Sequence, residues 1–454
     1  MTVAWMVAVC IGIGVAIRLL RRLPRLVFAA TLVGLILLLV LLLTAAGAPS
    51  SFFGRTLTLD LPTRAFLLVS IGMTAALALF GPLTFERASD VPSIVIANSQ
   101  GSFFFWSLAS LILAITLDSF SLAVFFWAIG LVILMLASHP QREGRVGGAA
   151  QFLLLIVIAG ACLLIGNRMI DLYPLTPENL DLIRNTVIFL ALGFGLLLAA
   201  APLTIWLGPL AEEMPTLGMA FLTAVAQPVG IWLLWQQMNA VSWLIDRSPW
   251  PSLLLTAGAI TVPVGALLLI AERRAGRLIA YAALVPLGYG LIGLGLGTRL
   301  GLSGAALEIL NRALSAALIA GGMSFVRHHL ERRWQVVGAL AIFGGALTMA
   351  GVPPTLGFAS HYAILKSLVA TNPEIVVVLL VSSAMASLAL LRVAWNFLSA
   401  GKPASSSAGE LKIVPYLCAI IVVILFVLNL LAGVFPQTII DPLLAALGQV
   451  AALK

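Results

Sequence analysis

Charged residues are scarce in this chain of 454 residues, where Asp, Glu, Lys and Arg make up 9% and hydrophobic residues make up 61%. A soluble domain carries about 25% charged residues, so this chain does not have enough polar side chains to cover a water-facing surface. No stretch between the apolar runs is long enough to form a soluble domain. These absences exclude a soluble enzyme and favour an all-α polytopic membrane protein.

Cysteine is also rare. The three copies, Cys10, Cys162 and Cys418, lie far apart inside apolar runs, and this spacing gives neither a disulfide framework nor a metal site. We find no nucleotide, haem, iron–sulfur or metal motif. The run GLGLG at 293–297 resembles a phosphate-binding loop, but it lies within an apolar run with no strand before it, so helix packing is the preferred interpretation. We therefore predict no metal, no other cofactor and no catalytic site of the chain's own.

Apolar runs long enough to cross a bilayer, about 20 residues each, recur from one end of the chain to the other. The first is interpreted as a spanning helix and not as a cleavable signal, because its arginines follow it. A polar linker is predicted at 402–412 and a surface tail at 441–454. We predict about 14 spanning segments, near residues 3–20, 26–46, 64–84, 99–117, 119–137, 148–168, 186–207, 216–238, 252–271, 276–297, 303–324, 335–369, 373–398 and 414–435.

Basic residues are unevenly shared between the two sets of loops. Fifteen Arg and Lys residues lie in the loops that lead from odd to even segments, against six in the other loops. Cytoplasmic loops of membrane proteins carry the excess of basic residues, so the loops from odd to even segments are predicted to be cytoplasmic. Both termini are then predicted on the outer side of a cell inner membrane. This asymmetry also accounts for the formal net charge of +8 without any nucleic-acid partner.

Two segments are interrupted by proline. The segment at 335–369 is too long for one straight helix and contains Gly351 and the pair Pro353–Pro354, and Pro202 interrupts the seventh segment in the same way. A proline removes a backbone donor and breaks the helix. Broken helices at matching places in two halves indicate an ion path in the middle of the membrane.

Three stretches together carry a resemblance to a known family. They are APLTIWLGPLAEEMPTLGMAFLTAVAQPVGIWLL at 201–234, RLIAYAALVPLGYGLIGL at 277–294, and LTMAGVPPTLGFASHYAILKSLVA at 347–370. The sequence resembles the antiporter-like membrane subunits of respiratory complex I, of membrane-bound hydrogenases and of Mrp-type cation/proton antiporters. The resemblance covers roughly residues 57 to 435, a span long enough for most of the predicted helices.

The resemblance implies a fold of 14 helices with two inverted five-helix repeats. The first repeat is helices 4–8 within 99–238, and the second is helices 9–13 within 252–398. An N-terminal three-helix segment at 1–98 precedes them, and a linker, the last helix and the tail at 399–454 follow. It also implies other membrane subunits as partners, surrounding membrane lipid, and a proton path in the membrane plane, with any redox chemistry in the partners.

The family path uses a glutamate on helix 5 and lysines on helices 7, 8 and 12, and this sequence departs from that pattern. Ala128 or Trp127 stands at the glutamate position, Leu197 at the first lysine and Gln227 at the second. Only helix 12 keeps an ionisable group at its position, namely His361.

The remaining ionisable residues of the membrane segments are candidates for a proton path, each with a plainer alternative. His361 is a surviving or substituted residue of the path, or it is a neutral histidine bonded to carbonyl groups at the break. Lys366 serves the path, or its long side chain reaches for the interface. Glu308 and Arg312 are four residues apart and share one helix face, so they form a structural ion pair or part of a rerouted path.

Three acidic residues near segment ends are given local interpretations. Asp118 is interpreted as the N-terminal cap of the fifth segment. Glu212 and Glu213 are interpreted as solvated charges in the loop after the seventh.

Three functions stay open at this point. The chain is a membrane-arm subunit of a complex I-like or hydrogenase-type complex that takes part in proton or cation translocation. Alternatively it is a non-conducting structural paralogue, which the replaced relay residues favour, or it is a stand-alone secondary transporter.

Overall fold

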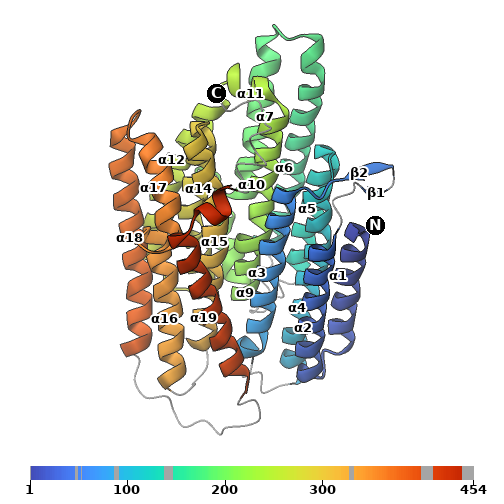
Figure 1. Ribbon diagram of the computed structural model, residues 1–454, viewed down its shortest axis with the longest axis vertical. Coiled ribbons are helices and arrows are strands. Elements are labelled where there is room, and N and C mark those ends of the chain that lie inside the picture. Colours follow the sequence, from blue (N-terminus) through green and yellow to red (C-terminus); the bar gives the residue numbers. More distant parts are fainter. Residues whose placement is uncertain are drawn as a thin grey trace.

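The computed structural model describes residues 2–45, 50–52, 54–85, 91–136, 147–326, 332–399 and 413–441. Long helices dominate these residues and run side by side along one direction (Figure 1). The predicted linker at 402–412 and the predicted tail beyond residue 441 lie outside the described residues.

The helices follow the chain in three groups. The N-terminal group is α1 (Thr2–Leu19), α2 (Pro24–Thr44), α3 (Leu61–Phe85), α4 (Val91–Thr116), α5 (Phe120–Leu136) and α6 (Gly147–Leu172). The middle group is η1 (Tyr173–Leu175), α7 (Leu180–Leu198), α8 (Leu207–Glu213), α9 (Thr216–Phe221), the π-turn η2 (Leu222–Ala226), α10 (Gln227–Ala240) and α11 (Ser242–Asp246). The C-terminal group is α12 (Trp250–Ala271), α13 (Ala275–Ala282), α14 (Leu284–Leu296), α15 (Arg299–Val326), α16 (Arg332–Ala350), α17 (Leu356–Leu368), α18 (Pro373–Ser399) and α19 (Ile413–Val434).

Each predicted spanning segment is occupied by helix. Twelve helical stretches among the described residues are long and apolar enough to cross a membrane. Two shorter apolar helices, Gln100–Thr116 and Phe120–Leu136, stand at the fourth and fifth predicted segments. The prediction of an all-helical, multi-pass membrane protein is therefore confirmed.

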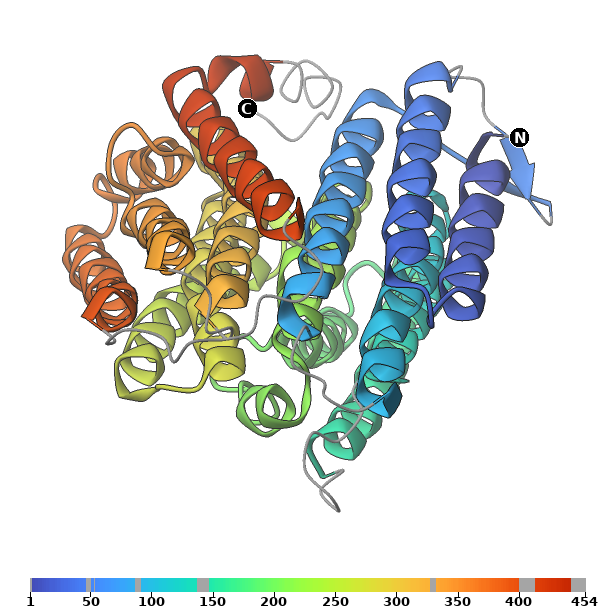
Figure 2. The same cartoon turned by 90° about the horizontal axis from the view of Figure 1, so that it is seen from below.

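The first two helices and α18 lie at opposite edges of the bundle. Viewed along the helices, α1 and α2 lie at one edge and α18 at the other, with the middle of the chain between them (Figure 2). The last helix, α19, does not continue outward but packs against α15, α17 and α3. It therefore covers the region where the C-terminal group meets the N-terminal one.

Small residues bring neighbouring helices close together. A side chain on Gly258 of α12 would overlap the carbonyl oxygen of Gly288 on α14. Glycines at such contacts allow two backbones to approach, which is how helices gain packing energy in lipid. The pair α12 and α14 is accordingly in extensive contact.

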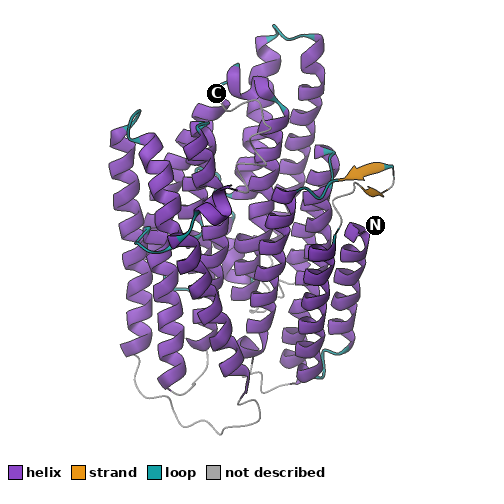
Figure 3. Ribbon diagram, in the orientation of Figure 1, coloured by secondary structure: helices purple, strands orange, loops and turns teal. Residues whose placement is uncertain are grey.

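A small hairpin was not predicted. Strands β1 (Ser50–Phe52) and β2 (Arg55–Leu57) pair antiparallel and project from the edge of the bundle (Figure 3). Asp118 binds this hairpin, because its carboxylate accepts hydrogen bonds from Thr56 and, at 3.0 Å, from Thr58. Asp118 stands two residues before the first residue of α5, as the sequence analysis placed it, and the structure adds that its carboxylate is bonded to the hairpin.

The two glutamates after the seventh segment are not free loop charges. Glu213 accepts hydrogen bonds from the backbone N–H groups of Gly148 at 2.7 Å and Ala149 at 2.8 Å. It thus caps the start of α6, where a helix leaves backbone donors unpaired. Glu212 forms ion pairs with Arg274 and, at 2.7 Å, with Arg277, which ties α8 to α13.

Candidate functional site at the second broken helix

The twelfth predicted segment is two helices separated by an extended break. Helix α16 ends at Ala350, and Gly351 follows with a φ of +66°. The Pro353–Pro354 peptide is cis, and α17 begins at Leu356. Gly351 is required twice, because its φ is left-handed and because a Cβ there would lie 2.5 Å from Nδ1 of His361.

The last helix closes this break with one amide side chain. Oδ1 of Asn429 accepts a hydrogen bond at 3.0 Å from the backbone N–H of Leu356, the first residue of α17. Its Nδ2 donates to the hydroxyl of Thr348. Both side chains are fully buried, so these bonds satisfy polar groups that lipid would leave unpaired.

Glu308 of α15 lies at the centre of the polar groups beside the break. Its carboxylate accepts hydrogen bonds from Ser360 and, at 2.8 Å, from Nδ2 of Asn311. Its Oε1 lies 3.7 Å from Nε2 of His361. Glu308 is 1% exposed and His361 4%, so the site holds an acid and a base together inside the membrane.

The distance between Glu308 and His361 is too long for a hydrogen bond. The Nε2 atom of His361 has no hydrogen-bond partner among the described residues. The imidazole is held by its faces instead, since it stacks on Tyr289 with ring centroids 3.8 Å apart. Tyr289 is fixed in turn by a 2.8 Å hydrogen bond to Ser383 of α18, so the position of the imidazole is set by its ring contacts.

Arg312 extends the polar line toward the first half of the chain. Its Nη2 donates a hydrogen bond to Oε1 of Gln227. Nε2 of Gln227 donates to the carbonyl oxygens of Leu197 at 3.3 Å and Leu198 at 3.2 Å. A guanidinium does not give up its proton, so Arg312 supplies a fixed positive charge, one helical turn from Glu308.

The seventh predicted segment is broken in the same way, and its partners are neutral. Helix α7 is followed by Ala199 with a φ of +60°, and the Ala201–Pro202 peptide is cis. The backbone N–H of Ala201 donates to the hydroxyl of Thr261 at 2.9 Å. The indole N–H of Trp206 donates to the carbonyl oxygen of Leu196 at 2.7 Å.

A π-turn, η2, lies directly before Gln227 in the eighth predicted segment, where the sequence analysis expected unbroken helix. The backbone N–H of Gln227 reaches back to the carbonyl oxygen of Leu222. The sequence signal was Pro228, which has no N–H to continue the regular ladder. The indole N–H of Trp127 donates to the carbonyl oxygen of Ala226 at 2.8 Å, so an aromatic side chain fills this interior.

The structure places the predicted site residues in two groups. Glu308, Arg312 and His361 are brought together with Gln227. Trp127 is fully buried there, whereas its neighbour Ala128 is only half-buried. Lys366 stands apart, because it is exposed and its Nζ lies 5.6 Å from the ring centroid of Tyr362. Lys366 is therefore not part of the buried cluster around Glu308.

Sequence reasoning missed four residues of the site, namely Asn311, Tyr289, Ser360 and Asn429. Three of them carried a usable signal. Asn311 and Ser360 each adjoin a predicted site residue, and Asn429 is a lone amide in an apolar run. Tyr289 carried no signal, because an aromatic residue in a spanning helix is ordinary.

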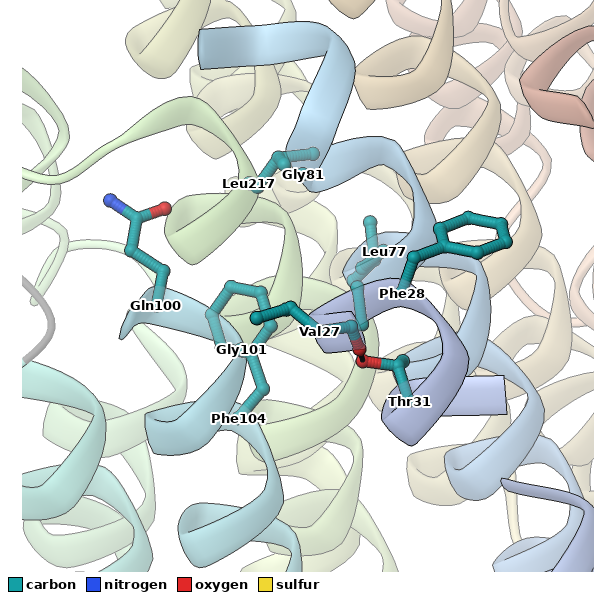
Figure 4. A pocket seen from close by; sticks show the side chains of 10 residues that line it. Val27, Phe28, Thr31, Leu77, Gly81, Gln100, Gly101, Phe104 and Leu217 are labelled. Carbon is teal, nitrogen blue, oxygen red and sulfur yellow. Dashed lines mark hydrogen bonds between the residues drawn. The ribbon is translucent and has the colours of Figure 1, made fainter. Parts of the chain in front are cut away.

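A small cavity lies outside this site, between α2, α3, α4 and α9 (Figure 4). Its volume is about 30 Å³, and Gln100, Thr31 and Phe104 are among the residues that line it. Oε1 of Gln100 has no hydrogen-bond partner among the described residues. The other lining residues are mostly apolar, and a cavity of this volume has room for a water molecule. In the part of the chain that the structure describes, no three His, Cys, Asp or Glu side chains are grouped to hold a metal ion.

Comparisons with known proteins bear on the family and the fold. The family model described as NADH:quinone oxidoreductase/Mrp antiporter, transmembrane, matches residues 118–386. NADH-quinone oxidoreductase subunit N of Desulforudis audaxviator (strain MP104C) is 30% identical over 374 residues, which cover 76% of this chain and 74% of that protein. Formate hydrogenlyase subunit 3 of Escherichia coli (strain K12) is 25% identical over 378 residues, which cover 75% of this chain and 61% of that protein.

A solved structure shows the same fold. A chain of respiratory complex I from Thermus thermophilus with bound NADH superposes with a TM-score of 0.75 and 20% identity. The match covers 99% of each chain. At this identity the likeness establishes the arrangement of helices.

Proposed function

Because the chain belongs to the NADH:quinone oxidoreductase/Mrp antiporter family, we propose that it is a membrane-arm subunit of a redox-driven complex and takes part in proton translocation. In this proposal the chain has no catalytic site of its own. Its partners are other membrane subunits, and electron transfer takes place in them. Two of its relatives are named as subunits of a quinone oxidoreductase and of a formate hydrogenlyase.

The observation that carries the proposal is the separated pair of Glu308 and His361 at the second break. An ionisable side chain inside a membrane is costly and is kept where it serves a path. Here a proton passes to Nε2 of His361, and the imidazolium then attracts the carboxylate of Glu308 across the present 3.7 Å. The proton leaves when the pair opens again, because Ser360 and Asn311 keep Glu308 hydrogen-bonded in the open state.

The same proposal includes the division of the chain into repeats and its orientation in the membrane. The residues 99–238 and 252–398 are two inverted five-helix repeats, and each contains one break. The repeats share a spacing, since the left-handed residue directly follows the helix and the cis proline comes three positions later, at Ala199 and Pro202 and at Gly351 and Pro354. The protein lies in a cell inner membrane with its basic loops in the cytoplasm and both termini outside.

A second function is favoured by a different observation, namely the neutral first break. Leu197 and Gln227 replace the ionisable residues of the family pattern, and buried Trp127 fills the space beside them. A scaffold that holds neighbouring subunits without conducting protons needs no ionisable groups. It would leave Glu308, Arg312 and His361 as a structural cluster.

The test uses the assembled complex in its native membrane. Membrane vesicles from cells that carry Glu308→Gln or His361→Asn are assayed for proton uptake and for electron transfer in parallel. We expect both variants to lower the protons moved per electron, because each removes an ionisable side chain and keeps a similar volume. The control is Gln237→Leu, which alters a buried amide of α10 bonded to Asn167 at 3.5 Å, away from the site.

The outcomes separate the two functions. If both variants assemble and pump as the wild type does, the proton path proposed here is wrong and the scaffold function stands. Extraction of a tagged chain in mild detergent identifies the partners. Recovery of the chain alone would contradict membership of any complex.

A further inference from the structure

An apolar groove lies on the membrane-facing side of the N-terminal helices. It lies between α1, α4 and α5 and has a volume of about 430 Å³. Its walls include Val7, Ile11 and Val15 of α1, Trp106 of α4, and Phe126 and Ile133 of α5. Ile11 is 48% exposed and Val15 44%, so the groove is open on its outer side.

The polar groups of the groove are already satisfied. The hydroxyl of Ser110 donates to the carbonyl oxygen of Phe126 at 2.7 Å. The indole N–H of Trp106 donates to the carbonyl oxygen of Ile11 at 3.3 Å. The groove therefore offers hydrocarbon contacts alone, and its occupant must be apolar along its length.

One glycine builds the groove. A Cβ on Gly14 would overlap the indole ring of Trp106. The missing side chain lets the N–H edge of this ring approach α1, and the ring forms part of the groove wall. The same contact brings α1 and α4 together.

A cation marks one end of the groove. Val7, Ile11 and Val15 are spaced four apart and therefore share one face of α1. Arg18, three residues after Val15, lies on the same face one turn further along. The guanidinium of Arg18 lies over the ring of Phe103 at 5.4 Å from its centroid. Phe103 lies one turn before Trp106 on α4, and Arg18 lies one turn after Val15 on α1. The two residues therefore meet just beyond one end of the groove.

We propose that this groove binds one phospholipid, with an acyl chain along the groove and the phosphate on Arg18. A guanidinium pairs with phosphate through strong charge-assisted hydrogen bonds. Arg18 also belongs to the loop predicted to be cytoplasmic, the side where anionic lipids attract basic residues.

The charge at one end favours a phospholipid over a helix from a neighbouring subunit. A phospholipid carries an apolar chain next to an anionic phosphate, which is the order of the apolar walls and Arg18 along α1. A spanning helix of a neighbouring subunit has an apolar surface, and nothing in that surface requires an anion at the level of Arg18.

The experiment counts lipids on the full-length protein in its native complex, extracted in mild detergent and examined by native mass spectrometry. The test variants are Ile11→Trp, which fills the groove, and Arg18→Gln, which removes the phosphate partner. The controls are Ile420→Trp, at a site on α19 that is 54% exposed, and Arg299→Gln, at an exposed site on α15. The exposure of Ile11 lets the larger side chain enter without disturbing the core.

We expect each test variant to lose about one phospholipid per chain, as a single site requires. The double variant should lose no more than either single one, and the controls should keep the wild-type number. Unchanged lipid in both test variants would overturn the proposal. If Ile11→Trp loses a partner subunit, the groove is a docking surface for a helix. If Ile11→Trp loses lipid and Arg18→Gln does not, Arg18 does not bind the phosphate. Both of these results would also contradict the proposal.

Discussion

The two broken helices have the same backbone and different surroundings. Each helix ends in a left-handed residue that is followed three positions later by a cis proline, at Ala199 and Pro202 in one and at Gly351 and Pro354 in the other. The first break is held by Gln227, Trp206 and Thr261, which carry no charge. The second has Glu308 and His361 beside it.

The comparison teaches that the break itself does not require a charge. Neutral donors satisfy the carbonyl groups of the first break as fully as ionisable groups would. The second break is closed by the neutral amide of Asn429, although ionisable groups lie nearby. The ionisable groups at the second break therefore serve something other than the backbone, which is why the proton path is placed there.

The largest expected effect comes from removing the acid at the second break. In Glu308→Leu, the side chains of Arg312 and His361 stay buried without the carboxylate. Loss of one partner from a buried charged cluster costs about 3–5 kcal/mol. The free energy of unfolding of the purified chain in mixed micelles should fall by that amount.

A triple variant makes the second break resemble the first. With Glu308→Leu, Arg312→Leu and His361→Leu together, no unpaired charge is left, and apolar replacement of a buried cluster costs about 0 kcal/mol or stabilises. We expect stability close to that of the wild type but no contribution to proton uptake. A triple variant as unstable as Glu308→Leu would show that the second break depends on charge after all.

The next effect concerns the link between the breaks. In Gln227→Leu, Arg312 loses its acceptor, and the carbonyl groups of Leu197 and Leu198 lose their donor. A buried charged group left unpaired costs about 2–3 kcal/mol. The same unfolding measurement checks this value, and a loss no greater than that of Gln237→Leu would contradict it.

The left-handed residues give effects of opposite sign. Gly351→Ala adds a Cβ in an unfavourable conformation and against the ring of His361, and we expect a loss of about 2 kcal/mol. Ala199→Gly relieves the same backbone cost but adds freedom to the unfolded chain, and a gain of about 0.5 kcal/mol is expected. If both substitutions shift the unfolding midpoint in the same direction, Ala199 and Gly351 do not have the same left-handed backbone conformation in solution.

The smallest effect lies at the membrane surface, where Glu272 precedes α13. Burial raises the pKa of Glu272. Hydrogen bonds from the backbone of Arg274 and Arg273 and from the side chain of Arg277 lower it by more, so the pKa lies below the ordinary 4.5. The ionised carboxylate thus stabilises the fold above pH 4.5, and this contribution is lost as pH falls through the lowered pKa. Glu272→Gln should cost about 1 kcal/mol at neutral pH, and the difference from the wild type should shrink in acid. A difference that persists at low pH would exclude this carboxylate as its source.

Much of the fold could be predicted from the sequence, because apolar runs and prolines are local signals. The prolines at 202, 353 and 354 located both breaks. The contacts across helices could not be predicted in the same way. Nothing in the chain order says that Arg312 reaches Gln227 or that Trp127 reaches Ala226, because such contacts depend on how helices rotate against one another.

The candidate site was predicted in part for the same reason. His361, Glu308 and Arg312 were found because charge is conspicuous in an apolar chain. Asn311 and Ser360 were missed although each adjoins a charged candidate, because the search followed charge alone, and Tyr289 was missed because an aromatic residue in a spanning helix is ordinary. Lys366 was included for its charge, and the structure places it on the exposed side of α17.

The closure of the second break by the last helix bears on how the protein is made. A side chain on Gly433 would overlap the carbonyl oxygen of Pro354, so α19 lies directly against the break that Asn429 closes. Chains are synthesised from the N-terminus and fold in that order. While the ribosome is still adding α19, the first break can already be complete and the second cannot. Biogenesis of this protein therefore ends with the step that completes the second break, and a chain released before α19 would expose unpaired backbone to lipid and become a target for membrane quality control.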